Sequence, residues 1–244
     1  MTTLLLDTDI LAYRAASSAE TEVDWGEDIW SLYTDLSAAK AGFSTQVDKI
    51  KNKLGATDVL CCLSDHKGNF RRSVDASYKS NRKGQRKPVG YVALCEWIRT
   101  TYAVRSMKFL EADDVMGILA GWPENKGKCV VVSDDKDLKQ ISGKLYRPTA
   151  DEMLDITPEE ADRFFLTQVL TGDITDGYKG VPGIGPKKAE AILGTRPEWG
   201  AVEKAYLAAG LTKQDAITQA RLARILRYED WDERKGEPIL WKPN

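Results

Sequence analysis

Residues 130–137 read VVVSDDKD, a run of three valines that leads directly into three carboxylates and one lysine. A continuous apolar run of this kind predicts a strand that is buried on both faces, as in a parallel sheet. Three acids within four residues repel one another and destabilise any fold that holds them close. The stretch therefore predicts a buried strand that delivers an acidic cluster in need of a neutralising partner.

The same pattern of a strand followed by acid occurs twice upstream. TLLLDTD ends in Asp7 and Asp9, and TDVLCCLSD ends in Asp65. VRSMKFL predicts another strand and KLYRP an edge strand, with predicted helices between the strands. This alternation predicts an α/β fold with a mainly parallel central sheet and helices on both faces. Ligand sites in such sheets form at the carboxyl ends of strands, so we expect the acids to converge there.

Helical periodicity accounts for most of the remaining chain. Apolar residues from Ile29 to Leu54 predict one long amphipathic helix over 27–54, and EADDVMGILAGW opens a helix that Pro123 stops. After about residue 150 the strand pattern ends, and Thr157 with Glu160 predicts a capped helix start. Further helices are expected at 89–102, 198–209 and 213–228. The predicted division is an α/β core over 1–150, with a basic segment at 66–87, and a helical region over 151–244.

Composition restricts the chemistry that the chain can perform. The 244 residues include four cysteines without a CxxC pair and a single histidine, which excludes a His-rich or Cys-rich zinc site. A metal would have to be held by oxygen ligands, as Mg²⁺ and Mn²⁺ are. No apolar run has membrane-spanning length, and the N-terminus lacks the features of a signal peptide. We therefore expect no membrane association and a cytoplasmic location.

Acidic residues cluster at two further places. Glu111, Asp113 and Asp114 open a predicted helix, while Asp173 and Asp176 are spaced to share one helical turn. Any one cluster could be simple helix capping. Four clusters with the same strand-end or helix-start placement favour a site for divalent cations, because converging carboxylates require them. Two Mg²⁺ ions bridged by carboxylates are suited to phosphodiester hydrolysis.

Basic residues concentrate between residues 71 and 87, where Asp75 is the only acid. A solvated charged loop is the plain alternative, but interleaved aromatics such as Tyr78 favour contact with nucleic acid. The glycine-rich stretch GVPGIGPKKA at 180–189 could bind phosphate through backbone amides or be only a helix–turn–helix corner. The candidate DNA-binding residues are Arg71, Arg72, Lys83, Arg86, Lys87, Gly183, Gly185, Lys187 and Lys188.

Taken together, these motifs resemble the 5′-nuclease superfamily, which includes flap endonucleases and 5′–3′ exonucleases. The resemblance is closest to the exonucleases of short-tailed lytic phages, which NRKGQRKPVGY and the C-terminal PILWKPN resemble. The order and spacing match from residue 3 to about 194. The segments that carry it are FRRSVDASYKSNR (70–82), EADDVMG (111–117), VVSDDKDLKQI (131–141) and GDITDGYKGVPGIGPKKA (172–189).

The resemblance implies roles for individual residues. One metal ion would be held by Asp7, Asp65 and Asp113, with Glu111 acting partly through water. The second would be held by Asp135, Asp137, Asp173 and Asp176, with Asp114 supporting either ion and Lys136 pointing away. Tyr78, Lys79 and Arg82 would steer the 5′ strand and contact the scissile phosphate. A helix–three-turn–helix motif at about 164–194 would grip duplex DNA, with a K⁺ ion in its turn.

The implied activity is a 5′–3′ DNA exonuclease with flap or RNase H-type activity. It would use two Mg²⁺ ions, or Mn²⁺ in their place. Its substrates would be duplexes with 5′ ends, nicks or flaps and RNA/DNA hybrids. It would serve phage DNA replication, primer removal, recombination or host DNA breakdown in the cytoplasm of an infected bacterium, alongside replication proteins. Two alternatives remain: a haloacid-dehalogenase-like Mg²⁺ phosphatase with Asp7 as nucleophile, and a non-catalytic binder of branched DNA.

Overall fold

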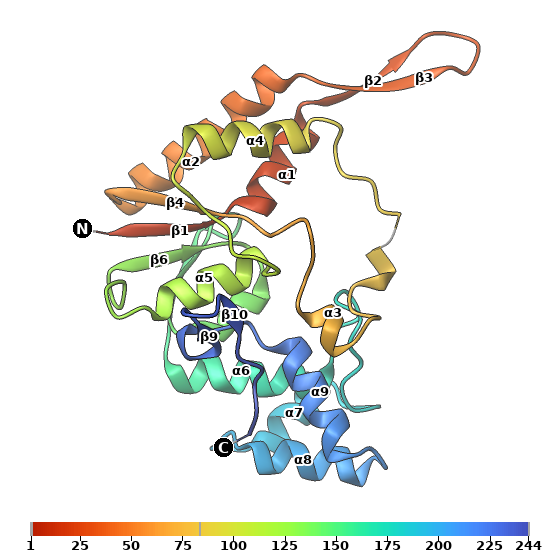
Figure 1. Cartoon of the computed structure of the whole chain (residues 1–244), viewed down its shortest axis with the longest axis vertical. Helices are drawn as coiled ribbons and strands as arrows, with labels where there is room; N and C mark the ends of the chain where they lie inside the picture. The colour runs from red at the N-terminus through yellow and green to blue at the C-terminus, as the bar shows by residue number, and fades with distance from the viewer. Residues whose placement is uncertain (1, 83, 244) are drawn as a thin grey trace.

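The structure is a computed structural model that describes residues 2–82 and 84–243, so Lys83 of the predicted DNA-binding set lies outside the described residues. Figure 1 shows a sheet with helices packed on it and, at the opposite end from a projecting hairpin, a group of helices from the C-terminal part of the chain. No helix within the described ranges is long and apolar enough to cross a membrane.

Six strands form the central sheet in the order β5–β4–β1–β6–β7–β8. The first five are parallel and β8 is antiparallel to β7, which confirms the α/β fold with a mainly parallel sheet. In chain order the strands are β1 (Thr3–Asp7), β4 (Asp58–Cys62), β5 (Val104–Arg105), β6 (Cys129–Val132), β7 (Gly143–Arg147) and β8 (Glu152–Ile156).

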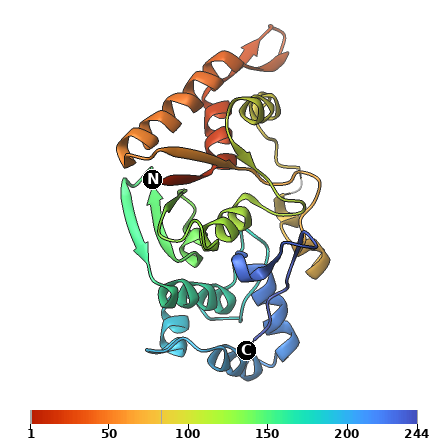
Figure 2. The same cartoon turned by 60° about the vertical axis from the view of Figure 1, so that its left-hand side comes forward.

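The sheet has a buried core on each face because alternate side chains of its strands point in opposite directions. Leu4 and Leu6 of β1 pack with α1 (Thr8–Ser18), α2 (Leu36–Leu54) and α4 (Tyr91–Thr101). Leu5 between them packs on the other face, with α5 (Ala112–Gly121) and the start of α6 (Pro158–Thr171). Figure 2 shows these two helical layers from the side. Burial on both faces explains why β1 and β6 are uninterrupted apolar runs.

A third core joins the C-terminal helices. Its members come from α6, α7 (Pro186–Leu193), α8 (Trp199–Ala208) and α9 (Lys213–Ala223), together with Tyr78 from the basic segment. The predicted capping box at Thr157 is confirmed, since its hydroxyl accepts from Glu160 N while the Glu160 carboxylate accepts from Thr157 N. Remaining short elements are α3 (Arg71–Val74), β9 (Trp231–Asp232), β10 (Glu237–Pro238) and the 3₁₀ helices η1 (Ser80–Arg82), η2 (Lys136–Gln140) and η3 (Tyr228–Asp230).

The expectation of one helix over 27–54 is wrong at its first third. Residues 20–34 form a hairpin of β2 (Glu20–Asp24) and β3 (Trp30–Thr34), and the helix α2 begins only at Leu36. The Asp35 carboxylate accepts a hydrogen bond from Ala38 N and so caps α2, which then continues through Gly42 to Leu54. The apolar residues at 29, 32 and 33 have helical spacing, but Ile29 and Tyr33 are exposed on the hairpin, so the pattern misled.

Three smaller expectations also require correction. β7 is not the edge of the sheet, because β8 pairs with its outer side. β8 also follows residue 150, after which no strand was expected. Only Ile156 of β8 is buried, and such an exposed edge strand lacks the apolar run of a central strand. The predicted strand VRSMKFL contributes only the two residues of β5. Helix α9 ends at Ala223 rather than near residue 228.

Candidate active site

Three acidic positions meet at the carboxyl edge of the central strands. β1 pairs with β6 in a register that sets Leu6 beside Val132, so Asp7 and the residues after β6 lie next to one another. Asp7 is 3% exposed, and its Oδ2 accepts a 2.5 Å hydrogen bond from Ser133 Oγ. Its Oδ1 accepts from Ile10 N and caps α1. The strand thus ends in a buried carboxylate that the next helix start helps to hold.

Burial and neighbouring charge raise the pKa of this carboxylate. Removal from water raises the pKa of Asp7 to about 7, and the negative charges of Asp9 and Asp135 contribute in the same direction. The pKa of Asp113, in the first turn of α5, is also raised well above 3.8. The main cause is burial, and the negative charges of Asp7 and Asp135 add to it. Asp7, Asp113 and Asp135 therefore form a mutually repelling group, called here the carboxylate trio.

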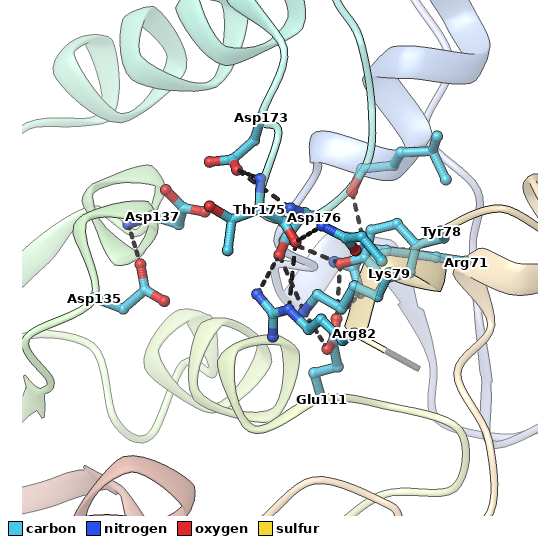
Figure 3. A network of polar contacts seen from close by, with 12 residues as sticks. Arg71, Tyr78, Lys79, Arg82, Glu111, Asp135, Asp137, Asp173, Thr175 and Asp176 are labelled. Atoms are coloured by element: carbon cyan, nitrogen blue, oxygen red, sulfur yellow. Dashed lines mark hydrogen bonds and ion pairs between the residues drawn. The ribbon is translucent and has the colours of Figure 1, made fainter. Parts of the chain in front are cut away.

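A second group of carboxylates is neutralised by cationic side chains of the same chain (Figure 3). Lys136 Nζ donates to Asp137 Oδ1 at 2.6 Å and to Asp173 Oδ2 at 2.8 Å. The expectation that Lys136 points away from the acids is therefore wrong. Its position follows from η2, which begins at Lys136 directly after the Asp135 cap and turns this side chain toward the 172–178 turn.

Lys79 and Arg82 neutralise the other carboxylates of this paired group. Lys79 Nζ lies 2.5 Å from Glu111 Oε1 and 3.5 Å from Asp176 Oδ1, and Arg82 Nη2 lies 2.8 Å from Asp176 Oδ1. Burial alone would raise the pKa of Glu111, but Lys79 and Arg71 together lower it to about 2. Glu111, Asp137, Asp173 and Asp176 are called the paired carboxylates below. Thr175 lies between them, and its carbonyl oxygen accepts from Arg82 Nε.

The turn that carries Asp173 and Asp176 is not helical, so the two acids do not share a helical face as expected. Asp173 Oδ1 accepts from Thr175 N and Asp176 N, which folds the chain back so that Asp173 N meets Tyr178 O. The base of this turn requires two glycines. A Cβ on Gly172 would lie 2.4 Å from the Lys179 carbonyl carbon, and one on Gly180 would lie 2.3 Å from Gly172 N.

Arg71 is a buried structural residue, which corrects its assignment to DNA binding. Its side chain is 3% exposed and donates from both terminal nitrogens to Asp114 at 2.7 Å, and to the carbonyls of Leu222 and Arg224. Asp114 is fully buried and also accepts from Leu226 N. Both its oxygens are thereby occupied, so Asp114 holds the fold together and does not support a metal ion.

Tyr78 is likewise buried, at 3% exposure. Its ring is therefore not available to contact nucleic acid, contrary to the expectation from the sequence. Its hydroxyl lies 3.0 Å from Glu111 Oε2 and 3.2 Å from Asp176 Oδ2, within hydrogen-bonding distance of both. Tyr78 therefore links the basic segment to the paired carboxylates and packs into the third core.

Three other acids near the site have defined partners. Asp65 accepts from Phe109 N and Lys67 N, and these backbone hydrogen bonds lower its pKa, so it is distinct from the trio. Asp9 accepts from Ser64 N and Tyr91 Oη, which connects the ends of β1 and β4 to α4. Asp134, whose role the sequence left open, accepts from Thr149 and pairs with Arg14.

A cavity of about 630 Å³ lies beside Glu111 and beneath the basic segment. Its basic lining residues are Arg14, Arg72, Lys79, Arg82 and Lys87. Lys87 Nζ also lies over the Tyr91 ring at 4.4 Å from its centroid, whereas Arg86 pairs with Glu20 of the hairpin at 2.7 Å. The wall of this cavity also carries Asp9, Asp65 and Glu111, so cationic side chains that suit a phosphate-bearing chain lie beside acids that suit a metal ion.

The stretch 180–189 leads from the base of the turn that carries Asp173 and Asp176 to the start of α7. Gly183 has a φ of +74° that favours glycine, and Gly185 precedes the helix with Pro186 at its first position. Lys187 is exposed. Lys188 Nζ donates to the Gly183 carbonyl at 2.9 Å, so this ammonium group is held by the turn itself.

The donor chemistry of the site fits a hard divalent cation. Within residues 2–82 and 84–243, no group of three or more Asp, Glu, His or Cys side chains is arranged so that it could hold a metal ion as the structure stands. The paired carboxylates are instead held by lysine and arginine. The trio, in contrast, contains half-buried and buried carboxylates whose mutual repulsion a divalent ion would relieve, and only oxygen donors are present.

Two polar residues of the site were not anticipated from the sequence. Ser133 hydrogen-bonds Asp7, and Lys136 bridges Asp137 and Asp173. A serine that directly follows one buried strand, beside an aspartate that ends the neighbouring strand, is the signal that could have identified Ser133. Lys136 offers no such signal, because its partner Asp173 lies 37 positions away in sequence.

Comparison with known proteins places these residues in context. A family model described as 5′-3′ exonuclease, N-terminal resolvase-like domain, matches residues 2–163. The chain is 32% identical to the exodeoxyribonuclease of Enterobacteria phage T3, over 98% of this chain and 92% of that protein. It is 31% identical to the exonuclease of Escherichia phage T7, with 98% and 93% covered. It is also 29% identical to DNA polymerase I of Bacillus caldotenax over 92% of this chain and 26% of that enzyme.

Solved structures of a flap endonuclease share the fold. The phage T5 enzyme in a complex with DNA and metal ions superimposes with a TM-score of 0.63 at 16% identity, covering 91% of this chain and 90% of that one. A second T5 structure, with zinc bound, gives a TM-score of 0.61 at 16% identity, covering 91% and 93%. These comparisons favour neither the phosphatase alternative nor the non-catalytic binder.

Proposed function

The chain belongs to the 5′–3′ exonuclease family, and from this membership we propose that it hydrolyses DNA from 5′ ends with the help of divalent metal ions. The carboxylate trio carries the proposal. The raised pKa values of Asp7 and Asp113 result from burial and like charge, which Ser133 at Asp7 and Lys79 at Asp113 offset only in part. Raised acidic pKa values at a sheet's carboxyl edge are typical of a catalytic centre.

We assign two metal ions to the acidic residues, with Mg²⁺ as the natural ion and Mn²⁺ as a substitute. Asp7, Asp65 and Asp113 would hold the first, with Glu111 acting partly through water. Asp137, Asp173 and Asp176 would hold the second, with Asp135 between the two sets because its charge acts on both Asp7 and Asp137. When bound, such ions supply the hydroxide nucleophile and stabilise the leaving 3′ oxygen.

The cationic side chains would act on the phosphate rather than on the carboxylates when DNA is present. Lys79 and Arg82 belong to the basic segment and line the cavity beside Glu111. A phosphate there would accept hydrogen bonds from both side chains. Their positive charges would offset the negative charge that develops on the phosphate as the bond breaks. Tyr78 would act as a positioning residue, because its hydroxyl contacts Glu111 and Asp176 and its ring is buried.

Duplex DNA would be held by the C-terminal helical region. We propose that the chain divides functionally into a nuclease core over 1–150 and a helical region over 151–244, with a helix–three-turn–helix motif at about 164–194. The exposed Lys187 and the backbone amides of Gly183 and Gly185 would contact phosphates. A K⁺ ion bound in this turn would compete with Lys188, whose ammonium already occupies the Gly183 carbonyl.

The substrates that fit this arrangement are duplexes with a 5′ end, a nick or a 5′ flap, and RNA/DNA hybrids. The similarity to an exodeoxyribonuclease of phage T3 and an exonuclease of phage T7 supports a DNA duplex with a free end as a substrate. Such an activity would remove primers or degrade DNA during phage replication and recombination.

The direct test incubates 5′-labelled and 3′-labelled duplexes, intact, nicked and flapped, with Mg²⁺ or with EDTA. We expect label to be released from 5′ ends and flaps, with Mg²⁺ required. Release from 3′ ends alone, or release that EDTA does not stop, would overturn the proposal. A small phosphate ester serves as the control substrate, and its hydrolysis at comparable rates would instead support the phosphatase alternative.

A further inference from the structure

The β2–β3 hairpin is an exposed apolar feature that the nuclease site does not use. Trp25 is 69% exposed, Ile29 59%, and both Trp30 and Tyr33 58%. None of these side chains belongs to the three cores found in the described residues. In both views the hairpin projects from the body, at the opposite end from the C-terminal helices. Clustered exposed aromatic residues are typical of a protein-binding surface.

The hairpin is well ordered despite its exposure. Trp25 Nε1 donates to Ser31 Oγ at 2.8 Å, and Trp25 N donates to the Ile29 carbonyl across the turn. Its base is fixed by Glu20, which pairs with Arg86 at 2.7 Å and accepts from Val89 N. A two-stranded ribbon alone is marginal in water, so these contacts hold the aromatic residues in one arrangement. A preorganised surface loses little entropy when it binds.

The two faces of the hairpin differ in character. Strand register places Asp24 opposite Trp30 and Glu22 opposite Leu32 on one face. Thr21 lies opposite Tyr33 on the other, where alternation also places Val23. Glu22 and Asp24 therefore share a face with Trp30, whereas Tyr33 lies on the opposite face. Between residues 15 and 39 the chain has no Lys or Arg and the acids Glu20, Glu22, Asp24, Glu27, Asp28 and Asp35.

This charge selects the occupant. Glu20 is paired with Arg86 and Asp35 caps α2, so the charge near the turn comes from Glu22, Asp24, Glu27 and Asp28. These carboxylates repel the phosphates of nucleic acid and the headgroups of an anionic membrane. They attract Lys and Arg at the rim of an apolar surface. We propose that the hairpin tip, defined by Trp25, Ile29, Trp30 and Tyr33, is a docking site for a partner protein that presents an apolar surface bordered by basic residues. The link from Glu20 to Arg86 joins the hairpin base to the C-terminal end of the basic segment.

The test uses the full chain as bait for a display library of random twelve-residue peptides. We expect the selected sequences to combine aliphatic or aromatic residues with several Lys or Arg. The most enriched peptide, made synthetically, should bind at least tenfold more weakly to Trp25→Ala/Trp30→Ala and to Glu22→Lys/Asp24→Lys. Its affinity should also fall with added salt. The matched control is Leu207→Ala/Met153→Ala, which removes two exposed apolar side chains elsewhere and should leave binding unchanged.

Several outcomes would overturn the proposal. They are no enrichment, enrichment of acidic or uncharged peptides, and equal binding to the hairpin variants. A dimer seen by light scattering in the unmodified chain and lost in Trp25→Ala/Trp30→Ala would identify a second copy as the occupant instead. Hairpin-dependent binding to single-stranded DNA or to phosphatidylglycerol vesicles would contradict the charge argument. Unchanged melting temperature and nuclease rate in the hairpin variants would show that only docking was altered.

Discussion

The carboxylate trio and the paired carboxylates lie in the same site yet differ in their neighbours. Lysine and arginine side chains form ion pairs with the second group. Asp7 is buried and its pKa is raised to about 7. Glu111 also loses water contact, but its pKa is lowered to about 2 because Lys79 and Arg71 lie beside it. Lys136 provides a counter-charge to Asp137 and Asp173 and helps to lower the pKa of Asp173, but burial still raises the pKa of Asp137, as it does that of Asp176 beside Lys79 and Arg82. Burial favours a raised pKa at each acid, and a cationic partner reverses that effect at Glu111 and Asp173 but not at Asp137 and Asp176.

This difference has a consequence for metal loading. The trio depends on a cation from solution, whereas the paired carboxylates already have cations that must move before a metal ion can bind them. Two of the cations that would be displaced, Lys79 and Arg82, line the cavity above the site. Binding of metal and binding of phosphate would thus release and use the same side chains, which couples the two events.

Removing one carboxylate of the trio should produce the largest predicted loss of cleavage activity. Asp135→Asn removes a carboxylate that acts on both Asp7 and Asp137. Loss of a metal ligand should reduce cleavage by about four orders of magnitude, while duplex binding is retained. Single-turnover cleavage and a binding assay with EDTA measure the two quantities. Asp155→Asn, at an exposed position on β8, is the matched control and should cleave normally. Full activity in Asp135→Asn would contradict the metal assignment.

Breaking a buried pair should affect stability rather than chemistry. Arg71→Met leaves Asp114 buried without its partner and removes hydrogen bonds to the carbonyls of Leu222 and Arg224. The free energy of unfolding should fall by about 3–5 kcal/mol. Urea unfolding followed by circular dichroism measures it. Arg72→Met is the control, because the neighbouring side chain is exposed and should change stability by less than about 0.5 kcal/mol. Equal effects of both substitutions would refute this role.

The comparison also separates what sequence can and cannot predict. That Asp7 and Asp135 would lie together followed from two apolar strands that each end in acid, because parallel strands deliver their ends to one edge. The hairpin was missed, since the apolar residues at 29, 32 and 33 have the spacing of a helical face and not the alternation of a strand. The partners of Arg71 and Lys136 come from distant segments, so no local pattern could reveal them. Local periodicity predicts strands and their ends, whereas charge pairing depends on the tertiary fold.

Removing one of the internal cations should have an intermediate effect. Lys79→Ala takes away the ammonium group that pairs with Glu111 and Asp176 and that we assign to the scissile phosphate. Cleavage should slow by about two orders of magnitude with little change in duplex affinity. Lys67→Ala, an exposed lysine in the same loop region, is the control. If Lys79→Ala weakened binding and left the maximal rate unchanged, Lys79 would serve only as an anchor for DNA.

The smallest predicted effect is a pH dependence of stability in the metal-free protein. The folded pKa of Asp7 is about 7, above its ordinary value of 3.8, so the stability linked to this group is complete below pH 3.8 and is lost as the pH rises through 7. The folded pKa of Glu111 is about 2, below 4.5, so its contribution is lost only in strong acid. Between pH 5 and pH 8, Asp7 therefore changes the stability while Glu111 does not.

The melting temperature in EDTA should accordingly fall by about 5 °C from pH 5 to pH 8. Mg²⁺ should abolish that fall, because an ion that binds the folded state stabilises it and neutralises the trio. Asp7→Asn should reduce the slope of the profile without metal, since asparagine can still cap α1 and remain neutral, while the raised pKa of Asp113 leaves a smaller slope. Asp58→Asn, an exposed acid at the start of β4, should keep the slope of the unmodified chain. A melting temperature that rises toward pH 8 in EDTA would mean that the trio is already neutralised within the chain.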